Sequence, residues 1–248
     1  MRICAAVFAA VFFAATAPSV GLAEEPSPKE IVQRADAIRF PQTDYEVSVA
    51  VTSVAPGKTP DVRRYEILSK GNDRTLVVTT EPAVDKGQVL LMREKDLWIY
   101  MPSLSQPLRL PLSQRLTGQV ANGDLARSNF SGDYDAAVAR TEEVNGVSYW
   151  VLELTATDKS MTYNKLLYWV SRSNFRPLKA EFYSLSGKIL KACRYENFVD
   201  AGGARRPSRV VMEDTLTAGS KSVLDYSNFQ LKAMQDKMFT KDYLKKFS

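Results

Sequence analysis

The sequence predicts a mainly β protein with a few helices, built around a single large curled antiparallel sheet of about eleven strands. Short apolar or alternating segments recur from residue 45 to residue 231, with turn residues between them. No internal repeat or low-complexity linker interrupts this series, so we expect one domain over residues 24–248. A sheet of this width must curl, close or split, and helical segments near its start and middle favour a curled sheet that they cover.

The first 23 residues have the pattern of a secretory signal peptide. Arg2 precedes an apolar run over residues 3–17, and Gly21-Leu22-Ala23 has the small residues of a cleavage site. The apolar run is shorter than the roughly 20 residues that cross a bilayer, which makes an uncleaved anchor the less favoured alternative. We therefore expect an exported protein that is cleaved after Ala23.

A helix and a strand are predicted next. Ser27-Pro28-Lys29-Glu30 has the form of a capping box with proline at the first helical position, and apolar residues recur at helical spacing as far as Arg39. The clearest alternation in the chain follows and predicts a half-buried antiparallel strand. The residues on the apolar face of that strand are Tyr45, Val47, Val49 and Val51.

Further strands are predicted at about 62–69, 74–80, 88–93 and 97–101, before an irregular insert over residues 103–135. The insert contains prolines, glycines and dispersed leucines, and a connection of this length usually has a task such as covering a site. We predict one or two short helices within it. After a hairpin that turns at Asn145-Gly146, strands are predicted at about 148–155, 166–171, 179–183, 189–198, 209–216 and 222–231, with a C-terminal helix from about Lys241.

The strand before the insert is apolar on both faces. Successive side chains of a strand alternate, so Trp98 and Tyr100 share one face while Leu97, Ile99 and Met101 share the other. Such a strand is either buried on both sides or lines an apolar cavity. The residues of this strand do not show which of its two faces lines a cavity and which packs against other elements.

Three tryptophans in mid-strand positions suggest an apolar cavity, because wide curled sheets enclose space that side chains do not always fill. The plainer alternative, which the sequence favours slightly, is that these aromatics are ordinary core. The candidate cavity residues are Tyr45, Val47, Val49, Val51, Trp98, Tyr100, Trp150, Leu152 and Trp169.

The composition argues against most chemistry. The chain has no histidine, which removes histidine-based catalysis and nearly every catalytic zinc site. After cleavage Cys193 is the single thiol, so no intramolecular disulfide can form. The net charge of +5 comes from scattered basic residues, unlike a nucleic-acid footprint. We expect no catalytic residues, metal, cofactor or nucleic-acid partner, and therefore no enzyme.

Several segments resemble a known family. The segment Leu97-Trp98-Ile99-Tyr100-Met101-Pro102 is similar to the Leu-Trp-x-Tyr-x-Pro segment of the periplasmic lipoprotein carrier LolA. The run from Tyr168 to Tyr183, continuing to Gly187-Lys188, resembles the LolA-like outer-membrane lipoprotein-sorting proteins. Ser113-Gln114-Arg115 and the ending from Met238 to Leu244 also match that family, so the resemblance spans nearly the whole chain after the leader.

The resemblance implies an incomplete β-barrel, closed by a helical lid over a cavity that takes acyl chains. It also implies a monomeric periplasmic carrier that moves lipoproteins or other lipids towards the outer membrane, with an inner-membrane exporter and an outer-membrane acceptor as partners. An envelope-assembly or stress-sensing subunit that binds a protein is the alternative, and a lipid-modifying enzyme is a third. In the family an early-strand arginine holds the lid, but no motif assigns that role among Arg63, Arg64 and Arg74.

Overall fold

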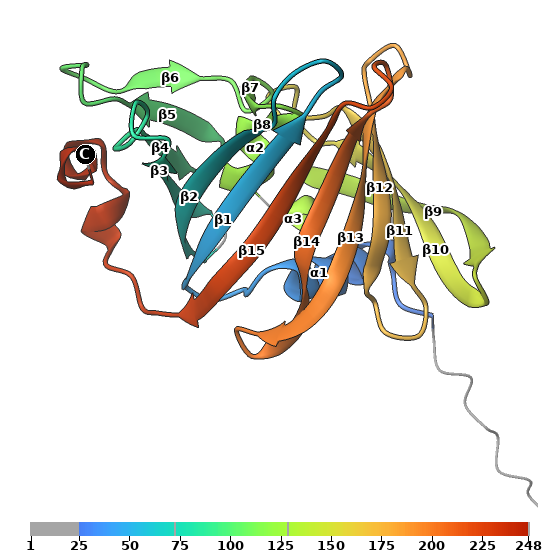
Figure 1. Ribbon diagram of the computed structural model, residues 1–248. Coiled ribbons are helices and arrows are strands. Elements are labelled where there is room, and N and C mark those ends of the chain that lie inside the picture. Colours follow the sequence, from blue (N-terminus) through green and yellow to red (C-terminus); the bar gives the residue numbers. More distant parts are fainter. Residues whose placement is uncertain (1–24, 72, 128, 248) are drawn as a thin grey trace, which may run out of the picture.

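The computed structural model describes residues 25–71, 73–127 and 129–247 (Figure 1). The predicted signal peptide, residues 1–23, and its cleavage site lie outside the described residues. Within the described ranges, no helix combines the length and the apolar character that crossing a membrane requires.

The first helix, α1 (Pro28–Arg39), begins at the predicted capping residue. The backbone N–H of Glu30 donates to the Ser27 side chain at 3.2 Å, and Pro28 lies in the first turn, where its missing N–H costs nothing. The apolar side of α1 is fully buried against the sheet through Ile31 and Ala35. The expected helix is therefore confirmed.

One antiparallel sheet of thirteen strands forms the body of the described chain. Neighbouring strands are consecutive in sequence except at one seam, where β1 pairs with β15 and joins the two halves. In order across the sheet the strands are β6 (Leu108–Leu110), β5 (Asp96–Tyr100), β4 (Val89–Arg93), β3 (Arg74–Glu81), β2 (Asp61–Lys70), β1 (Tyr45–Val54), β15 (Lys221–Leu231), β14 (Ala204–Asp214), β13 (Ile189–Ala201), β12 (Pro177–Tyr183), β11 (Lys165–Ser171), β10 (Val147–Ala156) and β9 (Tyr134–Val144).

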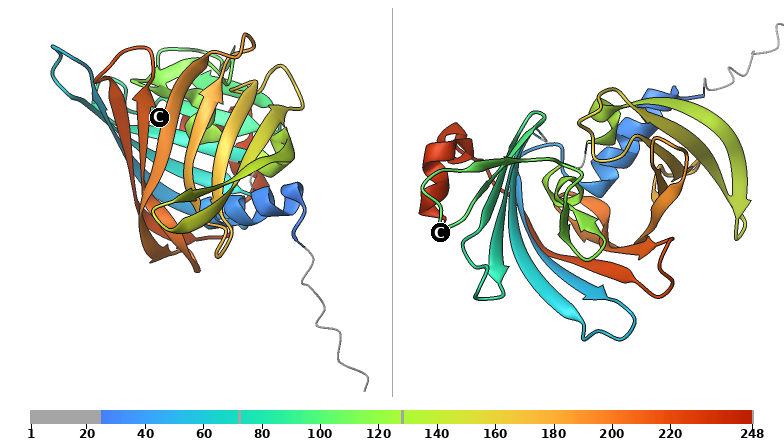
Figure 2. Two further views of the ribbon diagram at one scale, coloured as in Figure 1. Left: turned by 90° about the vertical axis from the view of Figure 1, so that its right-hand side faces the viewer. Right: turned by 90° about the horizontal axis from the view of Figure 1, so that it is seen from above.

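The sheet is strongly curled but does not close, since β6 and β9 form its two edges (Figure 2). This confirms the predicted curled antiparallel sheet. The sheet has thirteen strands rather than about eleven, because β9, the first strand of the Asn145-Gly146 hairpin, and β6 of the insert add to the delimited ranges. The insert contributes three strands of two or three residues in all. These are β6 and a separate hairpin of β7 (Arg115–Thr117) and β8 (Val120–Ala121), which are too short to show an alternation in the sequence.

The insert enters the hollow of the sheet, as Figure 2 shows from above. It contains two short helices, α2 (Asn122–Ala126) and α3 (Phe130–Asp133), and α3 packs against α1. We call α1, α2 and α3 together the lid. The predicted covering insert with one or two short helices is therefore confirmed.

Two separate apolar clusters lie on the two faces of the sheet. The larger fills the concave side beneath the lid, and the smaller lies on the outer side of β2 to β5. The smaller cluster is covered by the chain end, which forms two 3₁₀ helices, η1 (Asp236–Phe239) and η2 (Lys241–Lys246). The expected C-terminal helix from about Lys241 is therefore present, and it is a 3₁₀ helix that docks Leu244 into the cluster, as Phe239 of η1 does.

Candidate functional site

The concave face carries six of the nine candidate cavity residues. Alternation along each strand turns them all inward, and each is at most 5% exposed. They belong to the large apolar cluster beneath the lid. These six are Tyr45, Val47, Val49 and Val51 on β1, and Trp150 and Leu152 on β10.

Trp98 and Tyr100 lie on the opposite face. Both pack in the outer cluster, where the ammonium of Lys241 lies 4.3 Å from the centre of the Trp98 ring. Leu97 and Ile99, the alternate residues of the same strand, pack in the inner cluster. The doubly apolar strand is therefore buried on both sides, and its two aromatics lie away from the hollow. The sequence could not decide this, because both faces are apolar.

Trp169 also lies on the outer face. Its neighbours Tyr168 and Val170 pack inward, so alternation along β11 turns Trp169 outward. Its ring lies beneath two cations, 3.9 Å from the Lys179 ammonium and 5.5 Å from the Arg140 guanidinium. Because alkyl stems and cation–π contacts cover it, Trp169 is 2% exposed without any covering helix.

A cavity lies between the lid and the inner face of β12 to β15. It encloses about 500 Å³ of space between atoms, counting the part that opens to solvent, and its lining is mainly aromatic and aliphatic. The lid supplies Arg39, Asp124 and Phe130, with Phe40 just beyond α1 and Arg127 just beyond α2. The sheet supplies Phe182, Cys193, Tyr195, Pro207, Val210, Met212 and Tyr226.

A buried ion pair connects α2 of the lid to β13 of the sheet. The Lys191 ammonium on β13 donates to the Asp124 carboxylate of α2 at 2.7 Å and to the Gln119 carbonyl at 2.6 Å. The Tyr163 hydroxyl donates to the same carboxylate at 2.9 Å. The Lys191 and Asp124 side chains are 8% and 6% exposed, so the charges compensate each other away from water.

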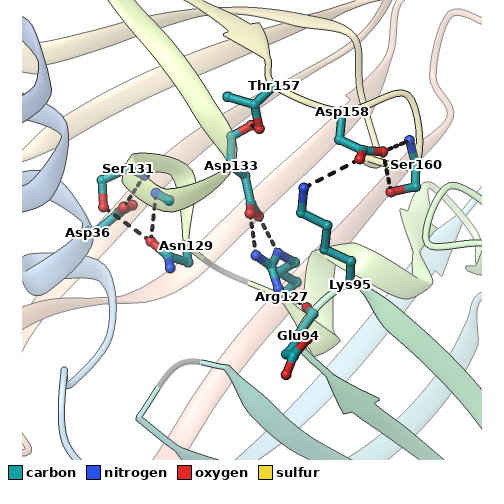
Figure 3. A network of polar contacts seen from close by, with 11 residues as sticks. Asp36, Glu94, Lys95, Arg127, Asn129, Ser131, Asp133, Thr157, Asp158 and Ser160 are labelled. Atoms are coloured by element: carbon teal, nitrogen blue, oxygen red, sulfur yellow. Dashed lines mark hydrogen bonds and ion pairs between the residues drawn. The ribbon is translucent and has the colours of Figure 1, made fainter.

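Polar contacts also bridge the open side of the curled sheet (Figure 3). Arg127 donates to the Asp133 carboxylate, which precedes β9, and to the Glu94 carbonyl in the turn between β4 and β5. Lys95 in that turn pairs with Asp158, which lies in the loop between β10 and β11, at 3.4 Å. We call these five residues the polar bridge, because they connect the two halves of the sheet opposite the β1–β15 seam.

A second buried pair lies within α1, and both of its members also contact α3. The Asp36 carboxylate accepts from Arg39 at 3.1 Å and from the backbone N–H of Ser131 at 2.7 Å. Burial raises the pKa of Asp36 to about 6, and the neighbouring Arg39 charge only partly opposes this shift. The Arg39 guanidinium also lies 4.0 Å from the centre of the Phe130 ring. The helices of the lid are therefore coupled by charge as well as by packing.

None of the three arginines considered as a lid latch contacts the lid in the described structure. Arg63 pairs with Asp61 and Asp85, Arg64 with Glu81, and Arg74 with Asp73 and Asp236, all in the outer part of the sheet or the chain end. The residues that do hold the lid, in particular Asp124, Arg127 and Lys191, were not expected. They belong to no motif, and only the fold brings them together from distant segments.

Among the described residues, no group of His, Cys, Asp and Glu side chains could hold a metal ion. Burial raises the pKa of the Cys193 thiol, so this cavity residue stays protonated and behaves as a small apolar side chain. The arrangement offers an apolar, aromatic-lined space with polar ties at its edges.

Comparisons with known proteins agree with this geometry. A family model described as an uncharacterized protein matches residues 71–246. A LolA superfamily protein from Nitrosomonas europaea is 55% identical over 88% of this chain and 99% of its own, with a TM-score of 0.85. A search of the curated proteins gives no match.

Two more distant structures share the fold. An outer membrane lipoprotein-sorting protein domain from Vibrio parahaemolyticus is 24% identical, with a TM-score of 0.75 over 88% of this chain and 98% of its own. A DUF1329 family protein from Desulfovibrio piger is 22% identical, with a TM-score of 0.76 over 88% of this chain and 97% of its own. The identity to the Nitrosomonas protein over most of both chains decides the family, and this chain belongs to the LolA superfamily.

Proposed function

We propose that this protein is a periplasmic, non-catalytic carrier that binds the acyl chains of lipoproteins or other lipids between its lid and the concave face of its sheet. The single domain of residues 24–248 would be released by cleavage after Ala23 and would work as a monomer. The observation that carries the proposal is the aromatic-lined cavity beneath a lid that polar ties hold to the sheet. The family and the lipoprotein-sorting relative support the same role.

Shielding is the physical basis of such a carrier. Each methylene that leaves water for an apolar cavity gains about 0.8 kcal/mol, so the cost of moving an acyl chain through the periplasm falls without any chemistry. The inner face supplies Tyr195, Val210, Met212 and Tyr226 for these contacts. A cargo with several chains needs more room than the present cavity offers, which requires the lid to move outward.

The ties of the lid differ in strength, and this suggests how it opens. The Lys95 and Asp158 side chains of the polar bridge are 46% and 42% exposed, so their ion pair contributes only about 0–1 kcal/mol. The Lys191–Asp124 pair is buried, so pulling its two charges apart would leave each uncompensated away from water, at a cost of about 3–5 kcal/mol. We infer that the open side separates first, at the Lys95–Asp158 pair and the exposed Arg127–Glu94 hydrogen bond, while α2 stays attached to β13. Transfer from an inner-membrane exporter to an outer-membrane acceptor would use this opening.

Native mass spectrometry of the protein purified from its own periplasm tests the proposal. We expect a mass increment of lipid or lipoprotein origin, and we expect delipidated protein to bind the uncharged fluorescent probe N-phenyl-1-naphthylamine. Val210→Phe narrows the cavity and should weaken probe binding, whereas Val199→Phe, the same change at a residue 42% exposed, should not.

Two results would count against the carrier. If the purified protein holds no lipid and the probe does not bind, the cavity has no carrier role. If the interior stays empty while a protein partner copurifies at fixed stoichiometry, the protein-binding alternative is favoured. Circular dichroism of both variants shows whether lost binding reflects lost folding.

A further inference from the structure

We infer that a basic pocket at the rim of the sheet binds the phosphate-bearing headgroup of the cargo, and that the cargo class is therefore a phospholipid or another phosphate-bearing lipid. The inference rests on the proposed carrier function and narrows it, since the acyl cavity alone does not distinguish one lipid from another. The pocket is lined by residues of the β1–β2 loop, the β7–β8 hairpin and the β14–β15 loop. Figure 1 shows these segments at the same end of the sheet.

Three cations from three separate segments line this pocket. Lys58 comes from the β1–β2 loop, Arg115 begins β7 and Lys221 begins β15. All three side chains are exposed, and none makes an ion pair or a side-chain hydrogen bond with the residues that the structure describes. Guanidinium and ammonium groups that line one pocket without an acidic partner are suited to binding a phosphate.

The two acids of the pocket are already engaged elsewhere. Asp61 accepts from Arg63 at 2.9 Å and from the Thr117 hydroxyl at 3.3 Å. Asp214 accepts from the backbone N–H groups of Leu216 and Thr217 at 2.7 and 3.1 Å. Their carboxylates shape the loops around the pocket, which leaves the three cations available for an external anion.

The floor of the pocket is held in place by close packing. The Ser53 and Ser222 hydroxyls are 3.0 Å apart across the β1–β15 seam, and the backbone N–H of Gln119 donates to Ser222 at 2.9 Å. Gly118 turns here with a φ of +49°, and a Cβ at that position would lie 2.1 Å from the Ser53 hydroxyl oxygen. Only glycine lets the β7–β8 hairpin approach this closely, so Arg115 is presented from a firmly placed element.

A neighbouring pocket lies between this pocket and the side chains that border the apolar interior. Arg115 and Gln119 also line a neighbouring pocket that reaches Tyr163 and Lys191. The Tyr163 ring lies 4.3 Å from the Phe182 ring, centre to centre, and Phe182 lines the acyl cavity. The pocket itself has about 1140 Å³ of space between atoms, open to solvent. A lipid with its headgroup at the rim and its acyl chains in the interior would therefore pass between the Tyr163 and Phe182 rings, which must separate to admit it.

Matched ligands test the inference on the full mature protein. Palmitoyl-lysophosphatidylglycerol and monopalmitoylglycerol carry the same chain with and without a phosphate, and glycerol 3-phosphate carries the phosphate without a chain. We expect calorimetric titration below micelle concentrations to give at least about tenfold tighter binding of the phosphate-bearing lipid, a factor that one charge-assisted hydrogen bond can supply. Glycerol 3-phosphate alone should bind far more weakly than either lipid.

The triple variant K58Q/R115Q/K221Q should lose this preference while keeping its affinity for monopalmitoylglycerol. The control K29Q/R93Q/K237Q removes the same charge from exposed cations outside the pocket and should keep the preference. Equal binding of the two lipids, or an unchanged preference in the first variant, overturns the headgroup site but leaves the carrier function intact. Binding of glycerol 3-phosphate as tight as that of the lipid would assign the pocket to free phosphate. If neither lipid binds, the carrier function itself fails.

Discussion

Replacing Lys191 by methionine tests how strongly α2 is held to the sheet. The change keeps an apolar stem of similar length but removes the ammonium that contacts the Asp124 carboxylate and the Gln119 carbonyl. Asp124 is then a buried carboxylate without a cation. It still accepts from the Tyr163 hydroxyl and from the backbone N–H of Ala121, at 2.9 and 2.8 Å, so it is not left without hydrogen bonds.

Removing one partner of a buried ion pair costs about 3–5 kcal/mol, because the remaining charge has no compensation. Asp124 retains two hydrogen bonds, so we expect K191M to lower the free energy of unfolding by about 3 kcal/mol, near the lower end of that range. In K191M/D124N no uncompensated charge remains, so we expect the double variant to recover at least about 1 kcal/mol relative to K191M. This recovery separates the charge effect from lost packing.

Urea unfolding followed by circular dichroism measures these differences, and hydrogen exchange over residues 122–126 locates them. Lys165→Met is the matched control, since the Lys165–Glu153 pair lies on the surface with side chains 38% and 43% exposed. That control should change the unfolding free energy by at most about 1 kcal/mol. If K191M costs no more than K165M, or if the double variant recovers nothing, the buried pair does not hold the lid as we argue.

Two further predictions concern the chain end and the pH dependence. Phe239→Ala opens the outer cluster and should lower the free energy of unfolding in urea by about 3–5 kcal/mol. Trp98 then meets water, so its fluorescence emission should shift to the red. The control Leu231→Ala, at a residue 55% exposed, should change the free energy of unfolding by no more than about 0.5 kcal/mol. An unshifted emission would contradict this. Asp36 has a folded-state pKa of about 6, above its unfolded value, so the folded protein binds that proton first. Wild type should therefore gain stability relative to Asp36→Asn as the pH falls from about 6 towards 4, and a constant difference between the two proteins would refute the shift.

Local patterns were sufficient for much of the fold. The capping box at Ser27 fixed the start of α1, and strict alternation identified β1, because both signals act between residues close in the chain. The insert was recognised by its prolines and glycines, because these residues interrupt strands whatever the tertiary structure around them. Its short strands β6, β7 and β8 were missed, since two or three residues cannot display a period.

The sequence assigned the faces of the candidate residues only in part for a related reason, and none of the nine lines the cavity itself. Alternation along β1 places Tyr45 and Val47 on the same face. The opposite face of that strand is polar, which shows that the face with Tyr45 and Val47 is the buried one. Trp98 and Trp169 lie on strands that are apolar on both faces, so no local signal says which side meets the lid. The ties of the lid were missed altogether, because Lys191 and Asp124 are 67 residues apart and neither has a sequence context that marks it.

By itself the sequence determined an antiparallel sheet with a capped helix before it, a covering insert and a chain without histidine chemistry. These are properties of composition and of contacts between near neighbours. The tertiary structure decided which face of each doubly apolar strand meets the lid, which charges hold that lid, and that Lys58, Arg115 and Lys221 meet in one pocket. These depend on how far the sheet curls and on which distant segments it brings together, and no residue carries that information locally.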